Sequence, residues 1–220
     1  MRVTIKIIAG LTGLAGLFIG NAAVAQVING GFETTSGAYT TGALGWTDTS
    51  GAAAGTTASA QRSTVNPFAG NADLALSYVN SATPGGGPAA SAQSDIFPTS
   101  GTSETFSFEA EGATLSPYEN NQVQVQWFGS GNAFLGATGF FSYQGTLTSS
   151  YSLQSFSLTA PAGTSGALIQ FLEAGSGNPN DAGVTRIDNV SLAGVPEPAT
   201  LSLAALGLLG VWTLRRSRKA

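Results

Sequence analysis

Two glutamates, Glu109 and Glu111, are the side chains of this sequence best spaced for acid–base chemistry. Two positions apart on one strand face, they would lie ~7 Å from each other, within the range of the two carboxylates of an inverting glycosidase. Thr105 and Ser107 would share that face, which is typical of a solvated strand end beside Gly112. We therefore expect no catalytic residue here, and a glycoside hydrolase is the least favoured function.

The composition excludes several other kinds of chemistry. The chain has no histidine and no cysteine, which excludes Ser-His-Asp and Cys-His catalysis, histidine metal sites and disulfides. Of its 8 basic residues only Arg62 and Arg186 lie within 26–194, whereas 11 of its 12 acidic residues lie there, a net charge of −9. Such a domain repels nucleic acid phosphates and anionic lipid surfaces, so no nucleic acid partner is expected.

A row of glutamines is the clearest candidate for ligand binding. Gln124, Gln126 and Phe128 alternate with Val123, Val125 and Trp127, so the first three would form one face of a strand and the other three would face the core. Amides beside an aromatic ring could hydrogen-bond sugar hydroxyls and stack on a pyranose, although an ordinary solvated face fits the pattern as well. Trp46 is either a further sugar platform on a loop or a core residue, and its neighbours Leu44 and Gly45 favour the core.

These candidates depend on strands, because the body of the chain follows a period of two. In 104–110, for example, Phe106, Phe108 and Ala110 alternate with polar residues. No segment of the body reads as an amphipathic helix, and 47–60 is expected to be a long surface loop. The predicted strands are 26–32, 73–79, 92–97, 104–110, 121–127, 134–143, 151–160, 167–173 and 185–192. In 151–160 the same rule, followed less regularly, places Leu153, Phe156 and Leu158 in the core. Nine short strands separated by Gly- and Pro-rich turns predict an all-β fold, an antiparallel β-sandwich of 26–194.

The two ends of the chain have to be separated from this domain. Residues 1–25 have a positive start, an apolar run and the small-x-small ending Ala23-Val24-Ala25, which predicts a cleaved secretory signal peptide. At the other end, 199–214 carries no charge and is followed at once by a basic tail, 215–220. An apolar run that stops at positive charge predicts a short transmembrane helix with its basic end in the cytoplasm. The membrane-stop residues are Arg215, Arg216, Arg218 and Lys219.

The C-terminal stretch 195–220 resembles a known sorting signal. Pro196, Glu197 and Pro198, then an apolar helix, then an arginine cluster occur in the order found in the PEP-CTERM proteins of Gram-negative bacteria. The resemblance implies export across the inner membrane and transient anchoring by the C-terminal helix. It also implies processing by an exosortase-type enzyme and delivery to the cell surface or the medium.

The body shows a second, weaker resemblance. It opens with Asn29-Gly-Gly-Phe-Glu33, continues with Gly45-Trp46 and closes with Ile187-Asp-Asn-Val-Ser-Leu192, similar to the jelly-roll sandwiches of carbohydrate-binding modules and galactose-binding-like domains. In such folds the first and last strands pair, which would bring Glu33 close to Asp188, and many relatives hold a structural Ca²⁺ there. The resemblance thus makes Glu33, Asp188 and the Gly31 carbonyl the candidate metal ligands, and hard oxygen ligands of this kind suit Ca²⁺.

The sequence therefore predicts an exported, non-catalytic surface or extracellular-matrix protein that binds exopolysaccharide. The alternative is a purely structural or adhesive module without affinity for sugars.

Overall fold

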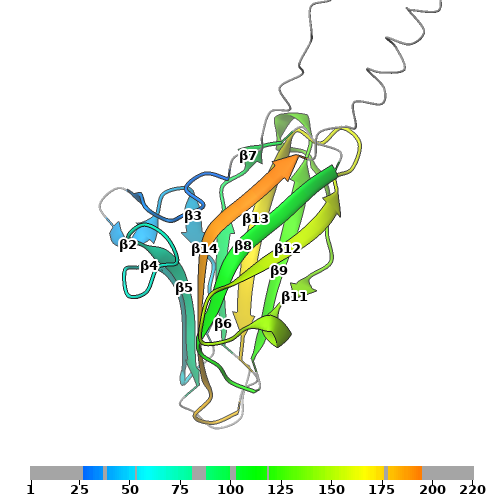
Figure 1. Ribbon diagram of the computed structural model, residues 1–220. Coiled ribbons are helices and arrows are strands. Elements are labelled where there is room, and N and C mark those ends of the chain that lie inside the picture. The colour runs from blue at the N-terminus through cyan, green and yellow to red at the C-terminus, as the bar shows by residue number, and fades with distance from the viewer. Residues whose placement is uncertain are drawn as a thin grey trace, which may run out of the picture.

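The protein folds into two antiparallel sheets packed face to face (Figure 1). The structure, a computed structural model, describes residues 27–36, 39–52, 54–80, 88–99, 103–117, 119–175 and 178–194. Sheet I has the strand order β10-β9-β13-β6-β3, with β11 also pairing with β9 and β7 with β13, and sheet II has the order β12-β8-β14-β5-β4. The all-β sandwich predicted from the sequence is confirmed.

The strands have the following bounds. Sheet I contains β3 (Trp46–Asp48), β6 (Ala89–Ser94), β7 (Phe97–Pro98), β9 (Asn120–Phe128), β10 (Phe134–Ala137), β11 (Phe141–Ser142) and β13 (Gly166–Ala174). Sheet II contains β4 (Thr56–Ser63), β5 (Asp73–Asn80), β8 (Ser103–Thr114), β12 (Ser152–Thr159) and β14 (Ala182–Gly194). The strands β1 (Thr35–Ser36) and β2 (Tyr39–Ala43) form a separate pair, and Ser130–Asn132 and Gln144–Thr146 are single turns of 3-10 helix.

The alternation of apolar and polar residues decides which face of each strand is buried. Phe106, Phe108 and Ala110 of β8 are fully buried, while the residues between them are partly exposed, as the sequence predicts. Val123 and Val125 of β9 are buried in the same way opposite them. The core therefore forms between the inner faces of the two sheets.

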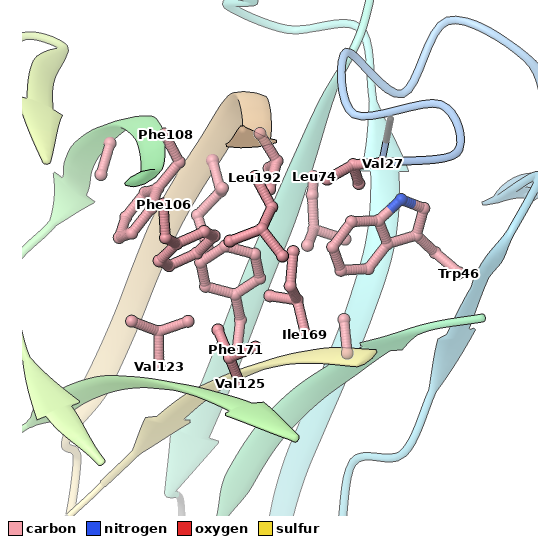
Figure 2. Close-up of a cluster of buried hydrophobic side chains, with 14 of the residues drawn as sticks. Val27, Trp46, Leu74, Phe106, Phe108, Val123, Val125, Ile169, Phe171 and Leu192 are labelled. Carbon is pink, nitrogen blue, oxygen red and sulfur yellow. The ribbon is translucent and has the colours of Figure 1, made fainter. Parts of the chain in front are cut away.

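Aromatic rings fill the centre of this core (Figure 2). The ring of Phe108 meets that of Phe171 edge to face at a centroid distance of 5.0 Å and that of Tyr143 at 5.1 Å. Phe106 packs beside them, 5.3 Å from Phe108. Full burial of each phenylalanine contributes roughly 1.5–3 kcal/mol, so this cluster is a main source of the sandwich's stability.

Two of the local predictions are wrong. Residues 47–60 do not form one long loop, because β3 and β4 occupy part of this range, and 26–32 is not a strand. The sequence does not reveal β4, because its Thr, Ser and Ala side chains give no hydrophobic alternation, yet its backbone pairs along the whole length of β5. The segment before β1 turns instead of extending, because Asn29 and Phe32 have φ of 51° and 55° and the Asn29 amide bonds the backbone of Thr34.

A third correction concerns one residue of β12. The sequence pattern places Leu153 in the core with Phe156 and Leu158, but its side chain is 64% exposed, and the buried neighbour is Gln154 instead. Gln154 is held by a hydrogen bond from the Thr146 hydroxyl to its Oε1, 2.8 Å long. The less regular pattern of this strand therefore leads to the wrong assignment of its inner face.

The predictions for both ends of the chain fall outside the described residues. This applies to the signal peptide 1–25, to the Pro196-Glu197-Pro198 motif, to the helix 199–214 and to the basic tail 215–220. In the described part of the chain, no helix has the length and apolar character needed to span a bilayer.

Candidate functional site

The outer face of sheet I carries a row of amide side chains that runs across four strands. Gln124 of β9 pairs with Gln170 of β13, Gln170 pairs with Gln93 of β6, and Gln93 pairs with Thr47 of β3. Since directly paired residues of an antiparallel sheet point to the same side, the three glutamines and the threonine form one continuous row. We call this row, with Gln126 and Phe128 beside it, the glutamine face.

Hydrogen bonds hold the amides of this face in place. The Nε2 of Gln124 donates to the Thr138 carbonyl at 2.9 Å, and the Nε2 of Gln126 donates to the Oε1 of Gln124 at 3.4 Å. The Nε2 of Gln170 donates to the Ser91 hydroxyl at 3.3 Å. Each amide offers two donor hydrogens and an oxygen with two lone pairs, so these bonds orient the row and leave capacity for a ligand's hydroxyl groups.

An aromatic pair closes one end of the glutamine face. Phe128 is partly exposed, and its ring meets that of Phe134 in β10 edge to face at 5.8 Å. Phe134 itself is 61% exposed. A face with uncharged amides in its middle and aromatic rings at its end combines the two contacts that sugars make with proteins, hydrogen bonds to hydroxyls and stacking on ring carbons.

The structure thus brings Gln124, Gln126 and Phe128 together as the sequence predicts and adds residues that sequence reasoning missed. Gln93, Gln170 and Phe134 are not part of that strand, and only strand pairing brings them to the same face. The sequence does indicate the side to which Gln170 points, because Gln170 stands between Ile169 and Phe171, which are buried on the other face of the strand. The order of the strands, which the sequence does not reveal, is the missing information.

Trp46 does not belong to this face. Its side chain lies on the inner side of sheet I among the core residues (Figure 2), and the residue is only 8% exposed. Its ring packs 5.1 Å from that of Phe32 and 5.9 Å from that of Phe171. Its Nε1 donates to the Ile28 carbonyl at 3.2 Å. Of the two alternatives for Trp46, the sugar platform on a loop is therefore wrong and the core residue is right. Trp46 also borders a cavity of about 280 Å³ between β3 and β4.

The three residues proposed as metal ligands do come together. The turn before β1 contacts the last strand, because the Val190 amide donates to the Gly30 carbonyl at 2.9 Å. A Cβ placed on Gly31 would lie 3.8 Å from Asp188 Oδ1 and 3.9 Å from Glu33 Cγ. The expectation that Glu33 and Asp188 approach each other is thus met, through a turn rather than through a strand.

The two carboxylates bind the loop between β4 and β5. The Ala69 amide donates to Asp188 Oδ2 at 2.9 Å, and the Asn71 amide donates to Glu33 Oε1 at 2.9 Å. The Ala72 amide also reaches Glu33 Oε1, at 3.3 Å. We call Glu33, Asp188 and residues 69–72 the loop anchor, since two separate carboxylates fix one loop onto the sandwich.

The donor set of the loop anchor is compatible with a hard cation. Burial raises the pKa of Asp188, and the amides of Ala69 and Asn189 partly offset this by stabilising its ionised form. A carboxylate accepts up to about four hydrogen bonds, so these amides leave lone pairs on both side chains. Among the described residues, no group of three or more His, Cys, Asp or Glu could hold a metal, so a cation here would need backbone carbonyls such as that of Gly31 as well.

Glu109 and Glu111 have different surroundings in the structure. Glu111 is 6% exposed, and its Oε2 accepts a hydrogen bond from Asn66 Nδ2 at 2.6 Å. Glu109 stands between Asp188 of β14 and Leu153 of β12 in sheet II. Glu111 is therefore more buried than the solvated strand end expected from the sequence, and its contact is with the β4–β5 loop.

Comparison with known proteins identifies the C-terminal segment. Residues 194–219 match the family model of the PEP-CTERM protein-sorting motif. No curated protein was found to match the sequence.

Solved structures with a similar fold are distant in sequence. A carbohydrate-binding module of the β-sandwich superfamily is 15% identical with a TM-score of 0.49, over 72% of this chain and 63% of that one. The enzymatically active domain of tailspike protein 4 of bacteriophage CBA120 is 17% identical with a TM-score of 0.50, over 76% of this chain and 21% of that one. The family 11 carbohydrate-binding module of Clostridium thermocellum is 16% identical with a TM-score of 0.44, over 80% of this chain and 98% of that one.

This chain spans less than two thirds of the first two structures, and the likeness concerns the fold alone. The sorting motif is the more informative match, since it covers the residues on which the C-terminal resemblance rests. The chain is therefore an exported protein that carries a PEP-CTERM protein-sorting motif at residues 194–219 next to a β-sandwich.

Proposed function

We propose that this exported protein is a non-catalytic surface or extracellular-matrix protein that binds a neutral exopolysaccharide through the glutamine face. The observation that carries the proposal is the pairing of Gln124, Gln170, Gln93 and Thr47 into one uncharged row across four strands. The C-terminal motif supports a route in which an exosortase-type enzyme processes a transiently membrane-anchored form.

The charge of the domain favours a neutral polymer over an acidic one. Residues 26–194 carry a net charge of −9, which repels polysaccharides that contain uronic acids or sulfate groups. The row itself consists of uncharged side chains, so a neutral glycan that covers it would not have to strip water from an ion. Hydroxyls of the glycan would bond the amides, and its ring carbons would pack on Phe128 and Phe134.

We also propose that the loop anchor holds a structural Ca²⁺ through Glu33, Asp188 and the Gly31 carbonyl. The closeness of Gly31 to Asp188 Oδ1 and to the Glu33 side chain supports the proposal, as does the preference of Ca²⁺ for hard oxygen ligands. Calcium would strengthen the attachment of the β4–β5 loop and would take no part in binding the glycan.

Affinity electrophoresis of the full chain in gels that contain a neutral glucan, a neutral xylan or acidic alginate tests the sugar proposal. We expect retardation by a neutral polymer and none by alginate. A Phe128→Ala, Phe134→Ala double variant and a Gln170→Ala variant should each lose at least about fivefold in affinity, or ~1 kcal/mol.

Leu153→Ala is the matched control, because Leu153 is an equally exposed apolar residue on the other sheet. Its retardation should equal that of the unmodified protein. Absence of retardation by every polymer, or equal loss in the control, would favour the second candidate function, a structural or adhesive module without affinity for sugars.

A further inference from the structure

At one end of the core the interior of the sandwich becomes polar and acidic. Three inner-face positions there are fully buried and not apolar: Asn121 of β9, Glu173 of β13 and Thr185 of β14. Glu119, in the connection between β8 and β9, is 3% exposed beside them. Two carboxyl groups thus lie in a region where an unpaired charge is costly.

The hydrogen bonds distinguish the two carboxyl groups. Glu119 accepts at both oxygens, from Asn121 Nδ2 at 2.8 Å and from the Ser116 amide at 3.1 Å. Glu173 accepts at Oε2 from the Thr185 amide at 3.3 Å, whereas its buried Oε1 has no hydrogen-bond partner among the described residues. Glu119 therefore has the surroundings of an ionised carboxylate, whereas Glu173 Oε1 has room for a proton.

Both glutamates are directed at the same point. A Cβ placed on Gly183 of β14 would lie 2.5 Å from Glu173 Oε1 and 2.6 Å from Glu119 Oε2. The Cε1 of Tyr78 would lie even closer to the same Cβ, so both oxygens and the Tyr78 ring surround the space that a side chain at Gly183 would fill. An alanine at this position would displace one or more of these groups.

In the described part of the chain, no basic side chain neutralises the pair. That part contains two, Arg62 and Arg186, and each is engaged elsewhere. Arg62 Nε donates to the Phe32 carbonyl at 2.7 Å, and Arg186 forms a salt bridge of 3.1 Å with Asp73. The other titratable groups that face the pair, Asp181, Tyr78 and Tyr143, carry no positive charge in any protonation state, and Asp181 adds to the repulsion.

These surroundings favour the neutral form of a carboxyl group. Burial raises the pKa of Glu173 well above its ordinary value, and the charge of Glu119 raises it further. Burial also raises the pKa of Glu119, against the lowering effect of its bonds with Ser116 and Asn121.

We propose that Glu119 and Glu173 share one proton, held on Glu173 Oε1 and directed toward Glu119 Oε2, and that its loss loosens this end of the sandwich. With the proton in place, the pair carries a single negative charge and links β13 to the β8–β9 connection. Without it, two carboxylates repel each other inside the core. A cavity of about 370 Å³ between residues 114–117 and 178–182, which Asp181 lines, gives water a place from which to enter.

The direction of the pH dependence follows from the raised pKa values. In the unfolded chain both glutamates titrate near their ordinary pKa of about 4.3. The stability due to the shared proton is therefore fully present below about pH 4.3 and is lost as the pH rises through the folded pKa. This trend is opposite to that of a carboxylate in a salt bridge.

Thermal melts of the full chain from about pH 5 to about pH 8.5 test the proposal, with a Glu173→Gln variant for comparison. The melting temperature of the unmodified protein should fall over this range by about 5 °C more than that of the variant, because the glutamine keeps a donor at the position of the proton. Asp95→Asn, at an exposed position between β6 and β7, is the control and should melt like the unmodified protein at every pH.

Two further measurements keep the test decisive if the variant folds poorly. The infrared spectrum at neutral pH should contain the carbonyl band of a protonated carboxylic acid, and its absence would overturn the proposal. Glu119→Gln should also reduce the pH dependence but with a lower melting temperature throughout, because its single amide oxygen replaces two acceptors.

Other outcomes would contradict a shared proton. If Glu173→Gln and the unmodified protein show the same pH dependence, the pair does not titrate in this range. If Ca²⁺ or Mg²⁺ raises the melting temperature at about pH 8.5 only when both glutamates are present, a metal ion rather than a proton neutralises the pair.

Discussion

Gly70 shows how one residue can decide the geometry of the loop anchor. Its φ of +65° is in the left-handed region, and a Cβ at this position would collide with the Glu33 carboxylate that binds the next two amides. Glycine is therefore required twice, once for its backbone conformation and once for the close approach of the carboxylate.

A comparison of two glycine variants separates these requirements. Gly131 has a similar φ of +68°, but a Cβ added there would meet no described atom within 4 Å, so Gly131→Ala should cost about 1 kcal/mol from backbone strain alone. Gly70→Ala should cost roughly 1.5–3 kcal/mol more, because Glu33 has to give up its bonds with Asn71 and Ala72. If urea denaturation gives the same free energy of unfolding for Gly70→Ala and Gly131→Ala, this account is contradicted.

At the same scale, the resemblance to carbohydrate-binding modules implies the approach of Glu33, Gly31 and Asp188 but not what the carboxylates bind. Their partners are backbone amides of residues 69–72, and every residue except proline has such an amide, so no side-chain pattern reveals them. Trp46 is the opposite case, because its neighbours in the sequence are enough to favour a core position. Its packing against Phe32 and Phe171 agrees with that prediction.

The β4–β5 loop is the element that the calcium proposal concerns. If Ca²⁺ occupies the loop anchor, EDTA should lower the melting temperature by about 5–10 °C, the effect of removing a ligand present at about a hundred times its Kd. Added Ca²⁺ in excess of EDTA should restore it.

Glu33→Gln serves as the variant that tells this site from any other. It should melt at the same temperature with and without EDTA, while Glu173→Gln should keep its response. If neither EDTA nor added Ca²⁺ changes the melting temperature of the unmodified protein, the calcium proposal is refuted.

Among the strands, those with large alternating side chains are predictable and those with small ones are not. The strands β8 and β9 alternate Phe, Val or Trp with polar residues, which locates both the strand and its inner face. In β13 the buried Ile169 and Phe171 stand on either side of Gln170, although Leu168 and Leu172 make its outer face partly apolar. In β4 the residues are Thr, Ser, Ala, Gln and Arg, and its strand conformation comes from hydrogen bonding with β5. Local sequence contains no record of that partner.

At the scale of the whole molecule, charge and strand order act together. The net charge of −9 is readable from the sequence, whereas the neutral row on sheet I requires the order β9-β13-β6-β3. The molecule thus combines an acidic domain with an uncharged face, and this combination leads to the proposal of a neutral glycan as its ligand.

An NMR titration of the isotope-labelled protein with a neutral oligosaccharide tests this claim most directly. The account predicts shifts in the side-chain amide resonances of Gln93, Gln124 and Gln170 and in the ring resonances of Phe128 and Phe134, with Leu153 unchanged. Shifts confined to Trp46 and the cavity between β3 and β4, with the glutamine amides unmoved, would contradict it.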